Sequence, residues 1–306
     1  MRLKPEDYAT IRVCDSWDYD SDNPGKYSGS LIAQYEELIK DKTVWIFRGH
    51  KNSKWELKTT LDRLIQASKI EPEKYKEFEG GLLDKFRREY HLYSQRIPEH
   101  NDLLEWFSLM QHHGTPTRLL DWTYSFYIAT FFALEDIYSP GEDGVEEAAV
   151  WAINSDWLEK KINVSNKKAF TCDDRHFRNP TNLRKIMNKS GVVKVNPYYV
   201  HERLSVQQGC FLFPGDITES FVENLRALAQ SDKDLKENLF QFVINKKKEC
   251  RDASLQKYIL DDLNRMNITR TSLFPGIDGY ASSLKVTSFV LPETLKVDAE
   301  YKKRFM

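Results

Sequence analysis

The stretch Leu109-Met-Gln-His-His-Gly-Thr-Pro-Thr-Arg-Leu-Leu-Asp-Trp122 lies between two apolar patterns of helical spacing. It contains two histidines, an arginine and an aspartate, whereas a helix-to-helix loop needs only glycine, proline and small polar residues. Since loops held between rigid elements often carry function, the stretch predicts a site as well as a connection. The alternative is a helix cap beside a buried pair of Arg118 and Asp121.

Two helices are predicted to flank this stretch. Apolar residues recur at helical spacing from Leu103 to Met110, Gly114 is the expected left-handed cap, and Pro116 prevents continuation. Residues 125–134 are apolar nearly all round, which predicts a central buried helix.

The rest of the chain mixes short strands and helices. Residues 43–47 fit a buried strand that ends in a turn at Arg48-Gly49, and a charged helix opening at Pro72 is expected to break at Gly80-Gly81. Further strands are expected at 148–153, 194–200, 210–213 and 239–244, helices at 31–39, 221–228 and 255–266, and turns at 272–279. Because strands and helices do not alternate regularly, the pattern predicts an α+β fold, a mixed sheet with helices packed around it.

The same patterns suggest a division of the chain. Residues 1–30 are polar and are expected to form an irregular N-terminal arm, and residues 31–140 hold the first globular part. Residues 141–290 are expected to continue that unit, with a basic insertion at 160–194, and residues 291–306 to form a tail.

Composition excludes several classes of protein. The 306 residues carry a formal net charge of -1, so whole-surface attraction to nucleic acid or membrane is not expected. No apolar run approaches transmembrane length, and the polar first residues lack the apolar stretch of a secretion signal. The four widely separated cysteines have neither metal-ligand nor redox spacing, which favours a reducing cytoplasm.

Residues 160–194 depart from this neutral balance. Ten lysines and arginines stand against two aspartates, so the segment carries a charge of +8. Such a segment predicts contact with an anionic partner, nucleic acid first, with Phe170 and Phe177 available to stack on unpaired bases. A solvated basic face is the alternative interpretation.

Arg48 and Gly49 are candidate ligand-binding residues. Arg48 follows four bulky apolar residues, and an arginine at the end of a buried strand suits a carboxylate or a phosphate. Gly49 allows a ligand or another backbone to come close. The alternative is a buried ion pair of Arg48 with an acidic side chain such as Asp121. We expect Arg48 and the loop 111–121 to line one pocket.

His112 and His113 are candidate catalytic residues. They lie at the predicted end of a helix, where the dipole favours protonated imidazole and is expected to raise the pKa. Because adjacent helical residues point about 100° apart, both cannot face the same ligand. Arg118 and Asp121 are three residues apart, which makes them candidate ligand-binding residues or a structural bridge.

A third candidate cluster lies at Ser205-Val-Gln207-Gln208-Gly-Cys-Phe211. Two amides and a glycine before an aromatic strand can hydrogen-bond a ligand ring or a phosphate. Gln207 is therefore a candidate catalytic residue, and Ser205 and Gln208 are candidate ligand-binding residues, with a polar turn as the alternative. The sequence lacks the Walker, dinucleotide, Gly-x-Ser-x-Gly and His-Glu-x-x-His patterns, and no metal site is predicted.

The stretch Trp45-Ile-Phe-Arg-Gly-His50 resembles the FRG-domain family, which is named for the tripeptide within it. The resemblance continues through residues 111–122 and the aromatic helix after them, and it implies an FRG domain over residues 31–140. Since members occur in bacteria and phages, it also implies a cytoplasmic protein with a role in defence or toxin activity.

A weaker resemblance is to ADP-ribosyltransferases of the arginine-serine-glutamate type. Their first strand carries an aromatic-Arg-Gly element like residues 47–49, and residues 204–207 are similar to their central serine-containing strand. The chain departs from that family after Ser205, where neither Glu-x-Glu nor Gln-x-Glu follows. The resemblance implies a fold of that type and NAD as the substrate.

The same resemblance implies roles for the candidate residues. Arg48 would grip the pyrophosphate of NAD, and Ser205 and Gln207 would position the nicotinamide ribose. One of the two adjacent histidines, oriented by Asp121, would bind ribose or transfer a proton. The other functions open at this point are a non-catalytic module that binds a nucleotide or nucleic acid, and a protein-interaction domain whose motifs are purely structural. No membrane partner is expected.

Overall fold

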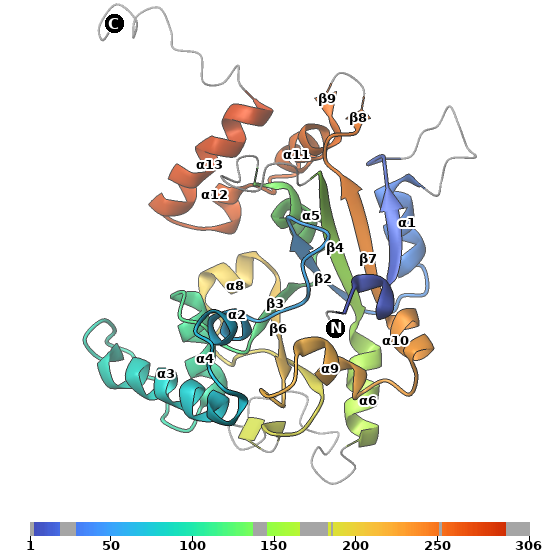
Figure 1. Ribbon diagram of the computed structural model, residues 1–306. Coiled ribbons are helices and arrows are strands. Elements are labelled where there is room, and N and C mark those ends of the chain that lie inside the picture. The colour runs from blue at the N-terminus through green and yellow to red at the C-terminus, as the bar shows by residue number, and fades with distance from the viewer. Residues whose placement is uncertain are drawn as a thin grey trace, which may run out of the picture.

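A seven-stranded mixed sheet lies at the centre of the protein, with helices around it (Figure 1). The computed structural model describes residues 3–18, 29–136, 146–165, 183–184, 186–250 and 253–291. The strand order is β1-β7-β4-β2-β3-β6-β5, in which β1 and β7 run parallel and all the other neighbours run antiparallel. The α+β class predicted from the sequence is confirmed.

The strands are short, as expected for a mixed sheet. Those of the main sheet are β1 (Thr10–Cys14), β2 (Trp45–His50), β3 (Leu120–Thr123), β4 (Glu147–Asn154), β5 (Val192–Val195), β6 (Gly209–Pro214) and β7 (Leu239–Asn245). A separate two-stranded ribbon consists of β8 (Glu249–Cys250) and β9 (Ala253–Ser254).

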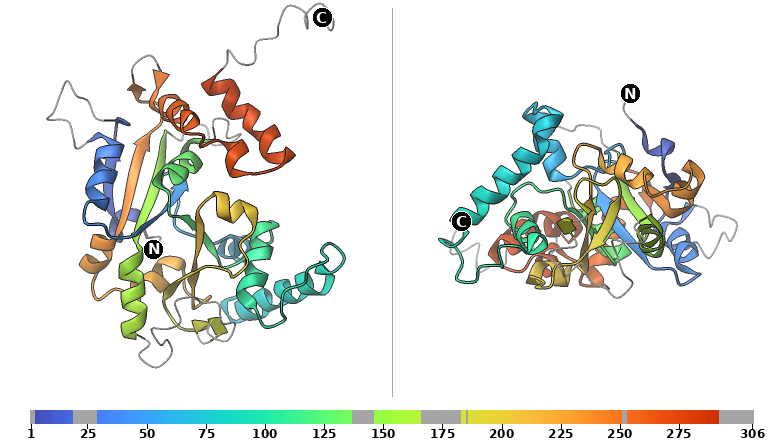
Figure 2. Two further views of the ribbon diagram at one scale, coloured as in Figure 1. Left: turned by 180° about the vertical axis from the view of Figure 1, so that it is seen from behind. Right: turned by 90° about the horizontal axis from the view of Figure 1, so that it is seen from below.

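Helices connect most of the strands. The α-helices are α1 (Leu31–Ile39), α2 (Thr60–Ala67), α3 (Tyr75–Tyr90), α4 (Leu103–His112), α5 (Phe126–Leu134), α6 (Ser155–Ser165), α8 (Glu202–Val206), α9 (Phe221–Arg226), α10 (Asp232–Asn238), α11 (Leu255–Arg265), α12 (Arg270–Leu273) and α13 (Ile277–Val290). Short 3-10 turns lie at Pro5–Asp7 and Pro72–Lys74. Seen from behind, α3 and α4 lie at one side of the molecule and α1 and α10 at the other (Figure 2).

The central strand β4 is buried on both faces. Because alternate side chains of a strand point to opposite faces, Val150 packs in the core that contains α5, while Trp151 and Ile153 pack in the core that contains α4. All three side chains are fully buried. The sheet is therefore a partition between two hydrophobic cores, with α1, α5 and α11 on one side and α3, α4, α6 and α9 on the other.

Helix α5 packs closely on β2 at Gly49. Among the glycines of the described strands, Gly49 has the closest approach of another segment's backbone. A Cβ atom added to Gly49 would lie 2.1 Å from the carbonyl oxygen of Ala129 and 2.6 Å from the amide nitrogen of Ala133. Ser125 caps the helix by accepting a hydrogen bond from the amide of Ile128. Gly49 was expected to let a ligand or another backbone come close, and the structure shows that the backbone of the predicted buried helix 125–134 does so.

Three expectations for the N-terminal half are wrong. Residues 10–14 of the expected arm form β1, because hydrogen bonds to β7 are available at the edge of the sheet. The strand expected to end before Arg48 continues to His50, since β4 pairs with it along its whole length. The helix expected to break at Gly80-Gly81 is continuous, because Leu83 beyond the glycines is buried and holds it in the core.

Two expectations for the C-terminal half also need correction. The strand expected at 194–200 lies at Val192–Val195, where it pairs with β6. The turn-rich segment at 272–279 is mostly the end of α12 and the start of α13, joined through Gly276 at a φ of 109°. None of the described helices is long and apolar enough to cross a membrane.

Gly49→Ala is expected to destabilise the protein, because the added methyl group meets backbone atoms that cannot move without shifting α5. Overpacking of this kind costs about 1–3 kcal/mol or more. Urea unfolding measures the loss. Gly81→Ala is the matched control, because Gly81 lies in α3 and no atom lies within 4 Å of the new methyl group. This substitution should raise the free energy of unfolding by about 0.5–1 kcal/mol. Equal effects of the two substitutions would contradict this account of the contact.

Candidate functional site

Two adjoining cavities open where β2 and β3 separate. These strands pair at a single position, Phe47 opposite Thr123, and the register would bring Gly49 opposite Asp121 if pairing continued. Instead the guanidinium of Arg48 reaches across and donates a hydrogen bond of 2.6 Å to the carbonyl oxygen of Asp121. The cavities therefore lie at a break in the sheet, where backbone groups and side chains of two strands are accessible to a ligand.

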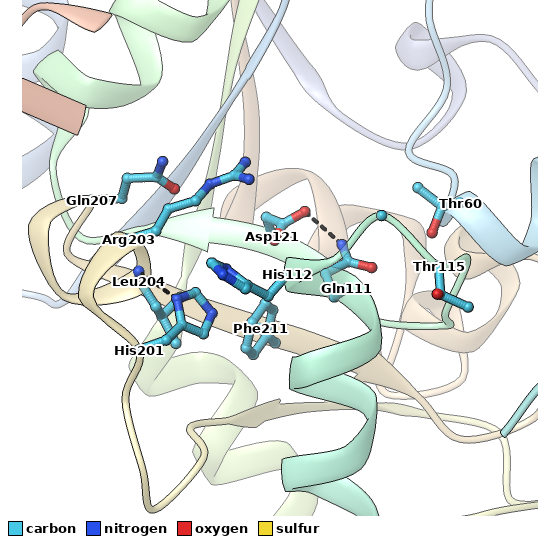
Figure 3. A pocket seen from close by; sticks show the side chains of 11 residues that line it. Thr60, Gln111, His112, Thr115, Asp121, His201, Arg203, Leu204, Gln207 and Phe211 are labelled. Carbon is cyan, nitrogen blue, oxygen red and sulfur yellow. Dashed lines mark hydrogen bonds between the residues drawn. The ribbon is translucent and has the colours of Figure 1, made fainter. Parts of the chain in front are cut away.

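The two cavities share part of their lining. The first has a volume of about 270 Å³ and lies between the end of α4, β3 and α8 (Figure 3). The second has a volume of about 190 Å³ and is lined by Arg48 and Gly49. Asp121, Arg203 and Gln207 line both. Arg48 and the loop 111–121 thus lie at neighbouring parts of one depression.

His112 reaches the first cavity from the end of α4. The helix ends as predicted, with His113 as its cap and Gly114 at a φ of 79°. The His112 ring lies 4.2 Å, between centroids, from the ring of His201, the cap residue of α8, and 4.7 Å from that of His113. His112 and His201 line the cavity, and His113 is exposed beside it. Sequence reasoning missed His201, although the pattern of a polar residue before a helix was a usable signal.

Both cavity histidines have lowered pKa values, contrary to the rise expected from the helix dipole. Burial lowers the pKa of His112, and the nearby His113 and Arg203 lower it further. Burial, His112 and Arg203 lower the pKa of His201 to about 4. In addition, Nδ1 of His201 accepts a hydrogen bond from the amide of Leu204, which requires the unprotonated nitrogen. Desolvation and like charges therefore outweigh the dipole, and both rings are neutral at pH 7.

Asp121 is held by an amide. Nε2 of Gln111 donates to the Asp121 carboxylate at 2.8 Å, and Oε1 of Gln111 accepts from the hydroxyl of Thr117 at 2.7 Å. The Asp121 carboxylate also lies 3.9 Å from Nη1 of Arg48, so the ion pair named as the alternative for Arg48 is formed, although the Asp121 side chain is 55% exposed and the pair is not buried. In the described structure the carboxylate is hydrogen-bonded to Gln111 and not to His112 or His113, so the expected orientation of a histidine by Asp121 is not formed.

Arg48 is held rigidly from two sides. Besides its bond to the Asp121 carbonyl, its Nε donates to Nε2 of His50 at 3.1 Å, and Trp151 donates to Nδ1 of the same ring at 3.2 Å. A neutral imidazole has one acceptor nitrogen, so His50 satisfies only one of these donors at a time. Burial and the charge of Arg48 keep the pKa of His50 well below its ordinary value. Burial also lowers the pKa of Arg48 to about 10, which leaves it charged at pH 7.

Arg203 is the second cation of the depression and was not singled out from the sequence. Its guanidinium lies over the ring of Phe274 at 4.4 Å, and no carboxylate of the described residues lies within 4.0 Å of it. Burial lowers its pKa and the charge of Asp121 opposes that shift. A guanidinium held by an aromatic ring keeps its hydrogen-bond donors available for an anion.

Arg118 is a structural residue and lines neither cavity, so its assignment as a ligand-binding residue is wrong. It is buried and forms a bidentate pair with Glu79 of α3, while its Nη1 donates to the carbonyl oxygen of Gly215 at 2.9 Å. The bridge expected between Arg118 and Asp121 is not formed, because Asp121 lies on the strand β3 and Arg118 lies at a bend before it, not on a shared helical turn.

The third candidate cluster divides between the cavities and the surface. Residues 202–206 form helix α8, so the serine-containing strand implied for 204–207 is wrong, and Ser205 is exposed and lines neither cavity. Gln207 lines both cavities while its side-chain amide donates to the carbonyl of Leu273 at 3.0 Å. Gln208 is an exposed turn residue with a φ of 47°, as the polar-turn alternative required.

The described part of the basic segment 160–194 is partly neutralised. Lys161 pairs with Asp234 at 2.7 Å, and Lys194 pairs with Glu159 at 2.6 Å. Phe170 and Phe177 lie outside the described residues. Among the residues that the structure does describe, no group of three or more His, Cys, Asp or Glu side chains is arranged to hold a metal ion.

These features define an α+β protein with a polar site at a break in its sheet. Residues 43–141 match the model of the FRG domain family, and the chain therefore contains an FRG domain. No curated protein and no solved structure matches the chain, so the resemblance to ADP-ribosyltransferases has no support from these comparisons. Arg48, His112 and Asp121 belong to the matched range, whereas His201 and Arg203 lie beyond it.

Arg118→Met is expected to lower the free energy of unfolding by about 3–5 kcal/mol, because it leaves the carboxylate of Glu79 buried without its partner. Urea unfolding of Arg118→Met, Glu79→Leu and the double variant gives the coupling free energy between the two side chains. The double variant should lose less than the sum of the two single losses. Strict additivity would show that the pair does not act as a unit.

Neutral His201 is expected to make stability fall in acid. The unfolded chain takes up a proton at this residue near pH 6.5, but the folded protein does so only near pH 4, so the contribution is complete above pH 6.5 and is lost as the pH falls to about 4. His201→Asn keeps a cap acceptor without titrating. Between pH 6.5 and about 4, the unfolding free energy of His201→Asn should fall less steeply than that of the wild type. The two slopes should differ by at most about 1.4 kcal/mol per pH unit. Parallel curves for the two proteins would refute the shifted pKa.

Proposed function

We propose that this chain is an enzyme that binds a phosphate-containing small molecule of nucleotide type in the two adjoining cavities. The observation that carries the proposal is the pair of guanidinium groups, Arg48 and Arg203, that line the second cavity together. They share it with one carboxylate, Asp121, which is more than half exposed. With the histidines neutral, the site has an excess of positive charge that an anion would balance.

The side chains suit phosphate in particular. Guanidinium groups bind phosphate oxygens with two parallel hydrogen bonds, and Arg48 is already fixed by His50 and the Asp121 carbonyl. A site prepared in this way loses little conformational entropy when the ligand binds. The two volumes together match the lower end of small-molecule sites, roughly 300–1,000 Å³.

A neutral histidine supplies the chemistry. The one acceptor nitrogen of neutral His201 is used by the amide of Leu204, whereas Nδ1 of His112 has no hydrogen-bond partner among the described residues. At pH 7 the ring of His112 can therefore accept a proton from a water or hydroxyl group that attacks the bound ligand. A bound phosphate would raise the pKa of His112 by adding negative charge, so the accepted proton would be better stabilised in the complex than in the free protein. His112 is the proposed general base, with Gln207 and Asp121 as groups that orient the ligand.

NAD is one ligand of this class and is the candidate implied by the weaker resemblance. The aromatic-Arg-Gly element and Gln207 line the second cavity, in keeping with such a ligand, whereas Ser205 lies on the surface. A role in bacterial defence or toxin activity in the cytoplasm is part of the same proposal. It rests on the FRG resemblance.

Arg203→Met is expected to weaken the binding of ADP, ADP-ribose or NAD by at least tenfold, because it removes the charged donor that lies over Phe274 and leaves an apolar side chain of similar length. Isothermal titration calorimetry measures the affinities. Arg265→Met is the matched control, since Arg265 is an exposed residue of α11, and it should bind as the wild type does. The proposal fails if none of these ligands binds the wild type, or if the Arg203 variant binds them equally well.

Product analysis by chromatography then separates an enzyme from a binding module. Turnover by the wild type that falls about 10²-fold to 10⁴-fold in His112→Gln, with binding retained, supports the proposed base. Binding without any turnover would identify the non-catalytic nucleotide-binding module.

A further inference from the structure

A third cavity lies along α3. It has a volume of about 260 Å³, and Thr115 lines both this cavity and the first cavity of the candidate site. The remaining lining residues all come from the second half of α3 and the residues just after it: Leu82, Lys85, Phe86, Glu89, Tyr90 and Tyr93. We call this cavity the α3 groove. The shared residue Thr115, which places the groove beside the polar site, is the first observation that points to a ligand.

The α3 groove is lined by aromatic rings that the core holds in place. Phe86 and Tyr90 are stacked on each other, with centroids 5.4 Å apart and planes inclined by 28°. Trp106 of α4 meets both rings edge-on, at 6.4 Å and 5.5 Å. Because both rings pack against the core and also line the groove, they form a preorganised surface for a flat apolar group.

The far end of the groove is formed by an aromatic residue that has no role in the core. Tyr93 is 82% exposed, although burial of a tyrosine ring would stabilise the folded protein. At the rim, the exposed Lys85 and Glu89 offer one hydrogen-bond donor and one acceptor group. The aromatic rings can stack on the face of a nucleobase, and the polar groups at the rim can hydrogen-bond its edge.

We infer that the α3 groove is the subsite for the planar aromatic ring of the ligand, a nucleobase, whose phosphate lies at Arg48 and Arg203. This inference rests on the proposed function and adds the chemical class of the rest of the ligand. The base stacks on Tyr90 and Tyr93, the sugar passes Thr115, and the phosphate occupies the cavities at the break in the sheet. The groove thereby distinguishes a nucleotide from a simple phosphate.

The test compares ADP with pyrophosphate, which has the same phosphoanhydride but no base. The wild type is expected to bind ADP at least tenfold more tightly than pyrophosphate. Stacking on an aromatic side chain changes affinity about 5-fold to 100-fold per base, so Tyr93→Ala and Tyr90→Leu should weaken ADP binding within that range. Both variants should bind pyrophosphate as the wild type does. Calorimetry supplies all of these affinities.

Two controls keep the outcomes distinct. Tyr280→Leu removes a 52% exposed tyrosine on α13, away from the groove, and should change neither affinity. Tyr93→Ala is the decisive variant if Tyr90→Leu unfolds, because Tyr93 is exposed and its removal leaves the core intact. If pyrophosphate binds but ADP gains nothing, or if Tyr93→Ala leaves ADP binding unchanged, the subsite is wrong and the proposed function stands. If neither ligand binds, both are wrong.

Discussion

The close contact between α5 and Gly49 is the constraint on which the site depends. A helix can approach a strand this closely only where the strand has no side chain, and Gly49 is that position. Since neighbouring residues of a strand point to opposite faces, the side of Gly49 also determines the side of Arg48 and His50. Arg48 is thereby directed away from α5, toward His50, Trp151 and the carbonyl of Asp121.

The break between β2 and β3 turns this local geometry into a cavity. A strand pair that continued past Phe47 and Thr123 would use its own backbone groups for pairing, and no ligand could reach them. The Arg48 side chain satisfies the carbonyl of Asp121 in place of a strand, so the sheet can open without a buried unsatisfied acceptor. The groups that flank the opening come from the FRG domain on one side and from α8 beyond it on the other.

Burial controls the charge of the site. Arg48 and Arg203 remain cations despite desolvation, whereas the same environment keeps His50, His112 and His201 uncharged. The two types of side chain behave differently because an arginine begins several pKa units above neutrality and a histidine begins near it. The result is a pocket in which fixed cations attract an anion while the neutral ring of His112 keeps a nitrogen without a hydrogen-bond partner. The aromatic α3 groove extends the pocket beyond these charges.

The elements whose cause is local could be predicted from the amino-acid sequence. The end of α4 at His113 and Gly114, the capped apolar helix α5 and the strand before Arg48 follow from glycine conformation, side-chain capping and hydrophobic periodicity, all of which act within a few residues. The α+β class followed from the order of these elements. Candidate residues such as Arg48, His112 and Asp121 were visible because polar groups interrupt apolar runs there.

Which of those side chains meet depends on contacts between residues far apart in the chain. Arg118 and Asp121 looked like a pair from their spacing, but Glu79, 39 residues away, takes the arginine, and Gln111 takes the aspartate. His201 and Arg203 enter the site because β6 pairs with β3, a contact between strands more than eighty residues apart that no local pattern records. The pKa of His112 falls instead of rising, because burial and neighbouring charges exist only once the chain has folded.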